Sequence, residues 1–172
     1  GNVIGQKESD YTANGWFIGK PINQIWDYKV IGIWQNDEWK EEVDALRKMC
    51  EQNGIHPLVE RSRSGRGAHV WIIFQQAIPA SKARNFGFML LDKGASSVNL
   101  KSFHYYDRMY PSQDMANSIG NLVALPLQGL ELKNGNSAFI DDNWNAYPDQ
   151  WDTLFNKTDK LGFGDISLDE AE

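Results

Sequence analysis

Apolar residues first recur at the spacing of an amphipathic helix shortly after Asp37. The pattern predicts a helix over residues 38–53, with the Asp37 side chain capping its first N–H groups and Gly54 ending it. Its apolar stripe consists of Val43, Leu46, Met49 and Cys50. Because Cys50 falls on this stripe, we interpret it as a packing residue and not as a nucleophile.

The same spacing predicts two further helices. One starts at Pro79 and ends at Gly94, where glycine can adopt the left-handed conformation that closes a helix. Its apolar stripe consists of Ala83, Phe86, Leu90 and Leu91. The other is opened by Pro148 and places Trp151 and Phe155 on one side. We interpret these two residues, together with Trp144 and Tyr147 just before the helix, as core or docking residues, with base stacking as the weaker alternative.

Strands are predicted where apolar residues alternate or run together between turn residues. The segments with this character are residues 28–35, 56–61, 68–74, 102–106 and 122–127. A glycine-containing turn joins the second segment to the third, which predicts an antiparallel hairpin. In the third segment His69, Trp71 and Ile73 share one face, and Val70, Ile72 and Phe74 share the other. One face can therefore pack while the other presents His69.

These elements predict an α/β (α+β) domain with an antiparallel or mixed sheet flanked by helices. The 172 residues, of which 41% are hydrophobic, fit one domain with a substantial core. We expect this domain to cover residues 1–160, with its motif-bearing core at residues 38–155. The acidic residues 161–172 are expected to form a flexible tail.

Charge is distributed unevenly along the chain. The formal net charge is −6, but residues 61–108 contain eight basic and two acidic residues, or +6, so the remainder carries −12. Such asymmetry favours a basic working surface on an acidic body, which suits a polyanionic ligand; scattered solvated charges are the alternative.

The single cysteine excludes an intrachain disulfide and leaves no Cys/His cluster with the spacing of a zinc site. A chain with a single cysteine fits a reducing cytoplasm best. Apolar runs such as residues 70–74 and 86–91 are too short to span a bilayer. We therefore expect no membrane role.

The strongest candidate for chemistry is the basic turn at residues 61–67, which leads directly into the strand that carries His69. Glycines let backbone N–H groups approach an anion, a serine adds a hydroxyl, and arginines can bind phosphate oxygens in pairs. The turn therefore predicts phosphate binding. The alternative is a solvated loop followed by a packed histidine.

Four ordered motifs support a named resemblance. They are RSRSGRGAHVW (61–71), YYDRMYPSQD (105–114), GNLVALPLQ (120–128) and NAYPDQW (145–151). Together they resemble the archaeo-eukaryotic primase-polymerases, in the subgroup found in TOTE conflict systems of bacteria and mobile elements. The resemblance covers roughly residues 38–155.

The resemblance implies an RRM-like core that joins nucleoside triphosphates on a DNA or RNA template and primer, using Mg²⁺ or Mn²⁺. Helicase or nuclease domains are implied as possible partners. The implied nucleotide-binding residues are Arg61, Arg63, Ser64, Gly65, Arg66 and His69, the implied catalytic residues are His69 and Asp107, and the implied metal ligand is Asp107. Asp107 has an alternative interpretation, a turn held by an Asp–Arg pair with Arg108, and Asp114 is the fallback acid.

The sequence departs from the family at its first motif, an apolar strand that ends in Asp-x-Asp. Residues 28–35 contain no acid, and the chain has no Asp-x-Asp anywhere. A degenerate primase fold, a metal-binding strand located elsewhere, and completion by other acids such as Asp27, Asp37 or Glu38 all remain open. We therefore expect a primase-polymerase-like domain with impaired nucleotidyl transfer, or alternatively an inactive nucleotide- or nucleic-acid-binding module of a larger replication, repair or defence assembly. A purely structural interaction domain is a third hypothesis.

Overall fold

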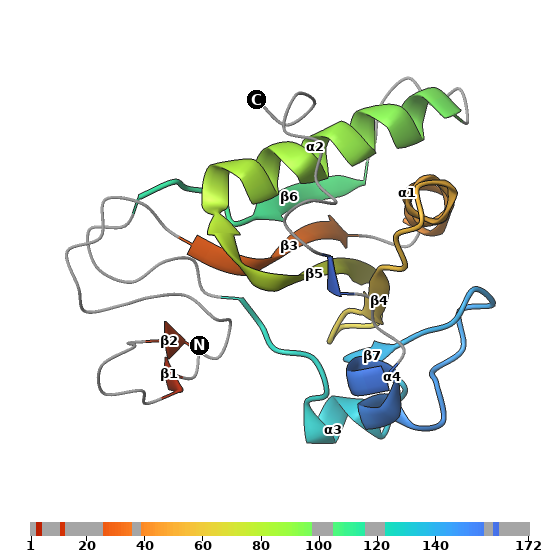
Figure 1. The fold of residues 1–172 in the computed structure, drawn as a ribbon. Helices are drawn as coiled ribbons and strands as arrows, with labels where there is room; N and C mark the ends of the chain where they lie inside the picture. The colour runs from red at the N-terminus through yellow and green to blue at the C-terminus, as the bar shows by residue number, and fades with distance from the viewer. Residues whose placement is uncertain are drawn as a thin grey trace.

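A computed structural model describes residues 3–4, 11–12, 26–35, 39–97, 105–115, 123–156 and 160–161. The helices are α1 (Lys40–Gln52), α2 (Ala80–Ser97), α3 (Gly129–Leu132) and α4 (Gln150–Asn156). The strands are β1 (Val3–Ile4), β2 (Tyr11–Thr12), β3 (Trp26–Gln35), β4 (Leu58–Arg61), β5 (Gly67–Pro79), β6 (Tyr106–Tyr110), β7 (Ala138–Phe139) and β8 (Lys160–Leu161). Figure 1 shows α1 and α2 beside the main sheet and α3 and α4 grouped near β7.

A six-stranded sheet forms the centre of the molecule, with strand order β6-β3-β5-β4-β7 and with β8 beside β5. The pairs along this path are antiparallel, and β8 is parallel to β5. In chain order the inner elements are β3-α1-β4-β5-α2-β6. This is the split β-α-β-β-α-β arrangement of RRM-like domains. The expected mixed sheet and α/β (α+β) class are therefore confirmed, and β1 and β2 form a separate two-stranded sheet.

Helices α1 and α2 cover one face of the sheet. The predicted stripe of α1 is buried, as are the predicted apolar residues of α2. They pack against β5 through Val70, Ile72 and Phe74. The predicted alternation of β5 is thus confirmed, because these three residues enter one core cluster while Trp71 enters another. Burial raises the pKa of the Cys50 thiol to about 12, which agrees with a packing role.

The start of α1 differs from the prediction in one respect. The helix begins after Trp39, which is almost completely buried and provides no side-chain cap. The predicted cap, Asp37, lies outside the described residues. At the other end Gly54 has a φ of 71°, the left-handed conformation expected for a helix stop.

The predicted end of α2 at Gly94 is wrong. The helix continues to Ser97, and Gly94 is a buried residue within it. Packing outweighs the helix-breaking tendency of glycine here, since an internal glycine costs only about 1 kcal/mol relative to alanine.

Two strand predictions also need correction. Strand β6 begins at Tyr106, so it overlaps the predicted segment 102–106 at one residue, and residues 102–104 lie outside the described part of the chain. Residues 123–127, predicted to be part of a strand, are not one. Pro126 has no N–H for a ladder, and Leu127 is left-handed, with a φ of 62°.

The second face of the sheet is covered by a smaller core. Its buried members are Leu58, Trp71, Val123 and Phe139. Strand β7 was not predicted from the sequence. It pairs with β4 and brings Phe139 into this core. A two-residue strand has no periodicity to detect.

Helix α4 contains the predicted pair Trp151 and Phe155, whose rings stack at a centroid distance of 5.9 Å. For these two residues the core alternative is wrong, because Trp151 is 59% exposed and Phe155 is 63% exposed. Trp144 and Tyr147, in contrast, are partly buried and pack against the two cores, as predicted. A docking role for them stays a prediction. From residue 162 onward, the expected flexible tail lies outside the described residues. In the part of the chain that the structure describes, no helix has the length and apolar character needed to cross a membrane.

Candidate functional site

The basic turn connects β4 to β5 and is closed by hydrogen bonds of its own. Ser62 N–H donates to Gly67 O and Gly65 N–H donates to Ser62 O, both at 2.9 Å. The Arg66 N–H donates to Ser64 Oγ at 3.3 Å. The N–H groups of Gly65 and Arg66 therefore stabilise the turn itself, and the groups that it presents to a ligand are mainly side chains.

Gly65 is favoured at its position mainly by its backbone conformation. Its φ is 76°, in the left-handed region that other residues rarely adopt. A Cβ at this position would also lie 2.8 Å from Asn136 Oδ1, so the end of the Asn136 side chain would have to move. The turn is thus packed tightly against the segment that follows α3.

Arg61, predicted to contact a nucleotide, is used mainly to hold the turn in place. Its guanidinium group donates to Gly135 O at 3.3 Å and to Trp144 O. Arg63, Ser64 and Arg66 lie further along the turn and are exposed. Within the turn, the structure therefore presents Arg63 and Arg66 as the cationic groups on the surface.

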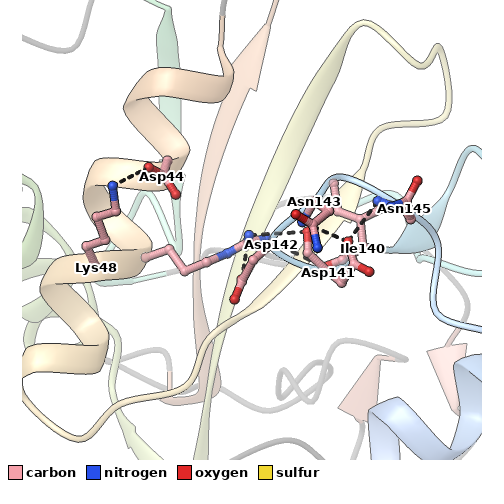
Figure 2. Close-up of polar contacts among 8 residues, drawn as sticks. Asp44, Lys48, Ile140, Asp141, Asp142, Asn143 and Asn145 are labelled. Atoms are coloured by element: carbon pink, nitrogen blue, oxygen red, sulfur yellow. Dashed lines mark hydrogen bonds and ion pairs between the residues drawn. The ribbon is translucent and has the colours of Figure 1, made fainter.

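The base of the turn is connected to α1 through residues 140–145. Arg47 on α1 donates to Asp142 Oδ1 at 2.8 Å and to the backbone carbonyls of Ile140 and Asp141 at 3.5 and 3.3 Å, and its guanidinium group lies 5.1 Å from the ring centroid of Trp144. Figure 2 shows this loop beside the helix. Because Trp144 O accepts the Arg61 hydrogen bond, α1, the loop and the turn form one connected support.

His69 follows the turn on β5, and its side chain is 13% exposed. Its Nδ1 lies 2.9 Å from Oε2 of Glu60, whose side chain is 2% exposed. The same oxygen accepts a hydrogen bond from Trp71 Nε1 at 2.8 Å. Glu60 was not predicted as a site residue; the signal in the sequence is an acid within an apolar strand, opposite His69 in the predicted hairpin.

Asp107 lies on β6, on the far side of β3 from His69. Ile33 of β3 pairs with His69 on one side and with Arg108 on the other, which places the His69 and Arg108 backbones about 10 Å apart. Trp34 then pairs with Tyr106, so Asp107 is the extra residue of a β-bulge. The structure therefore brings the end of the turn, His69 and the first residues of β6 to the same end of β3.

The exposed Asp107 carboxylate accepts a hydrogen bond from Arg108 Nε. This hydrogen bond raises the pKa of Arg108, and burial, followed by the negative charge of Asp107, raises the pKa of Tyr106 to about 12. The predicted Asp–Arg pair is thus present. The fallback acid Asp114 pairs with Arg84 of α2.

The side chains that the structure describes do not fit a divalent cation. Mg²⁺ and Mn²⁺ sites need several carboxylate oxygens, and among the described residues there is no group of three or more His, Cys, Asp or Glu side chains suited to hold a metal. Asp107, the predicted metal ligand, already accepts a hydrogen bond from Arg108. The other candidate acids, Asp37, Glu38 and the side chain of Asp27, lie outside the described part.

A comparison with protein families gave a match over residues 22–166, to the archaeo-eukaryotic primase domain of the TOTE conflict system. The match covers most of the chain and includes the turn, His69 and Asp107. A search of curated proteins gave no match.

Proposed function

Because the chain belongs to the archaeo-eukaryotic primase family of TOTE conflict systems, we propose that it binds nucleotides and nucleic acid and that its template-directed nucleotidyl transfer is impaired. The observation that carries this proposal is the composition of β3. This strand lies between the strands of His69 and Asp107, yet its residues 28–35 contain no carboxylate, and its one acid, Asp27, pairs with Ile78 towards the other end of the strand.

Phosphate binding is supported by the cationic side chains around this end of the sheet. Arg63 and Arg66 are exposed on the turn, and Arg108 is exposed on β6. Guanidinium groups donate paired hydrogen bonds to phosphate oxygens and need no metal to do so. A nucleoside triphosphate and the backbone of a DNA or RNA template both offer the required oxygens.

Impaired transfer follows from the chemistry of the missing carboxylates. A divalent cation supplies neutralisation of the triphosphate and activation of the attacking 3′-hydroxyl. Asp107 alone, with Arg108 bound to it, is a poor site for such a cation. We therefore expect weak transfer or none.

A second candidate is a wholly inactive binding module of a larger replication, repair or defence assembly. The Asp107–Arg108 hydrogen bond favours it, because a carboxylate committed to a neighbouring guanidinium group is less available to a metal. Helicase or nuclease domains are the partners that we propose for such a module, in the cytoplasm.

Primer extension tests the proposed impairment. The chain, its Asp107→Ala variant and a control variant of an exposed acid on α2, Asp92→Ala, are compared with Mn²⁺ and mixed nucleotides under conditions in which the template is bound. We expect little or no extension from any of them. Robust extension that is lost in Asp107→Ala but kept in Asp92→Ala would contradict the proposal and show that acids outside the described residues complete the site.

A further inference from the structure

The best-defined polar cluster near the turn is built around the buried carboxylate of Glu60. Glu60 on β4 pairs directly with His69 on β5 and, on its other side, with Phe139 on β7. Its Oε2 accepts from both His69 Nδ1 and Trp71 Nε1, at 2.9 and 2.8 Å. One buried oxygen therefore fixes two neighbouring side chains of β5.

This arrangement determines which part of His69 is available to a ligand. The hydrogen bond made by one imidazole nitrogen sets the role of the other. Because Nδ1 is directed at Glu60, Nε2 lies on the opposite side of the ring, away from β4. The His69 side chain keeps 13% of its surface exposed, so part of the ring is open to a ligand.

A purely structural role explains Glu60 poorly. Its neighbours Leu58, Val59 and Phe139 are apolar and buried, so its carboxylate is placed in apolar surroundings and is held by the His69 and Trp71 donors. A buried carboxylate is costly to desolvate, and the Trp71 N–H alone needs only a neutral acceptor. An acid at this position is better explained by what it does to His69.

We propose that Glu60 is a positioning residue that holds His69 with Nδ1–H donating to its carboxylate, so that Nε2, carrying the second proton of an imidazolium when the anion is bound, donates to a phosphate oxygen of the nucleotide or nucleic acid. The inference rests on the proposed binding function. It also assigns a role to a residue outside the basic turn. Trp71 supports the arrangement by holding the shared carboxylate oxygen in place.

Two substitutions separate the charge of Glu60 from its hydrogen bonds. Glu60→Gln keeps a carbonyl oxygen that can accept from both donors, whereas Glu60→Leu removes the acceptor. Thr153→Val is the control, because Thr153 is a buried polar residue on α4 whose hydroxyl donates to Asp149 O. Unfolding by urea establishes that each variant is folded.

The first measurement is the binding of inorganic triphosphate and of a single-stranded oligonucleotide, at low salt with EDTA. We expect Glu60→Leu to weaken both by about tenfold, Glu60→Gln to restore most of the affinity, and Thr153→Val to bind like wild type. Equal binding by a folded Glu60→Leu variant and wild type would refute the role of Glu60.

The second measurement is the ¹⁵N NMR signature of the His69 ring, assigned by its loss in His69→Gln. In the free wild type we expect a proton on Nδ1, and on addition of triphosphate we expect the Nε2 signal to move to that of a nitrogen that also carries a proton, taken up from solvent. A ring in which Nδ1 carries no proton overturns the proposal without any need for a Glu60 variant. Absence of any binding by wild type, despite the expected ring signature, would instead refute the proposed function and the phosphate contact with it.

Discussion

At the residue scale, the basic turn depends on backbone conformation as much as on charge. Gly65 is left-handed and packs against Asn136, and Arg61 ties the turn to two backbone carbonyls. These contacts keep Arg63 and Arg66 on a fixed loop. A fixed loop loses less conformational entropy when it binds a phosphate group.

Gly65→Ala tests this packing. We expect it to lower the free energy of unfolding by about 1–3 kcal/mol, because alanine is strained at this φ and its Cβ would collide with Asn136. Urea unfolding measures the change. Gly129→Ala is the control, since a Cβ there meets nothing within 4 Å. A fully stable Gly65→Ala variant would mean that the turn is not packed as described.

Cys50 gives a prediction about pH. Its folded pKa of about 12 lies above its ordinary value of 9.0, because burial disfavours the thiolate. Between these pH values the unfolded chain binds fewer protons than the folded one, so the free energy of unfolding falls as pH rises, by up to about 1.4 kcal/mol per pH unit. Cys50→Ala lacks this contribution. Urea unfolding from pH 8 to 11 should therefore give a shallower decline for the variant, and identical slopes would contradict the assignment.

The two faces of β5 were predictable because successive side chains of a strand point to opposite sides, and the residues on the two sides enter different core clusters. The roles of Glu60 and Arg61 were not. From the sequence alone, an acid in a four-residue strand and an arginine beside a glycine turn are both expected to be exposed to solvent. The hairpin already places Glu60 opposite His69, but the burial of Glu60, its shared hydrogen bonds and the contact of Arg61 with Trp144 arise only in the tertiary structure.

At the element scale, α1 was predicted closely because its apolar stripe is regular, whereas α2 was ended too early at Gly94. Local stop signals are weak compared with packing against a sheet. The strand prediction for residues 123–127 is wrong for a different reason, the conformation of their backbone. Its apolar residues do pack, through Val123, but Pro126 and the left-handed Leu127 prevent a strand.

The connection between α1 and the loop at residues 140–145 is testable through Arg47. Arg47→Ala leaves the carbonyls of Ile140 and Asp141 without this donor, and we expect it to lower the free energy of unfolding by about 2–3 kcal/mol. Its partner Asp142 is 74% exposed and stays hydrated, so no buried charge is stranded.

Lys48→Ala is the matched control for Arg47, one residue further along the same helix (Figure 2). Lys48 forms an exposed ion pair with Asp44 at 2.8 Å. Surface pairs of this kind contribute little to stability, so the variant should unfold like wild type in urea. Equal losses in both variants would show that Arg47 does not tie the loop to the helix.

At the scale of the whole molecule, a chain with a net charge of −6 carries a basic turn beside the end of its central strands. The fold class and family were predictable, since ordered motifs and βαββαβ patterning are properties of sequence. The site was predictable only in part. Its residues come from three strands, and their convergence depends on the register of β3 with both neighbours.

The turn should dominate the electrostatic part of nucleic-acid binding. We expect Arg63→Ala and Arg66→Ala each to weaken binding of a single-stranded oligonucleotide and to reduce the slope of log K against log salt by up to about one. Lys48→Ala, on the outer surface of α1, is the control and should keep the wild-type slope. Fluorescence titrations across a salt series measure the affinity and its salt dependence for each variant. Unchanged slopes in both arginine variants would place the binding surface elsewhere.

The most direct test of the account is the metal dependence of binding by the unmodified chain. Binding of a labelled single-stranded oligonucleotide is measured in EDTA and in Mn²⁺ at matched ionic strength. If His69 and the arginines hold the phosphates, the two affinities agree and both fall steeply with salt. Binding that appears only with Mn²⁺ would contradict the account and indicate a carboxylate metal site.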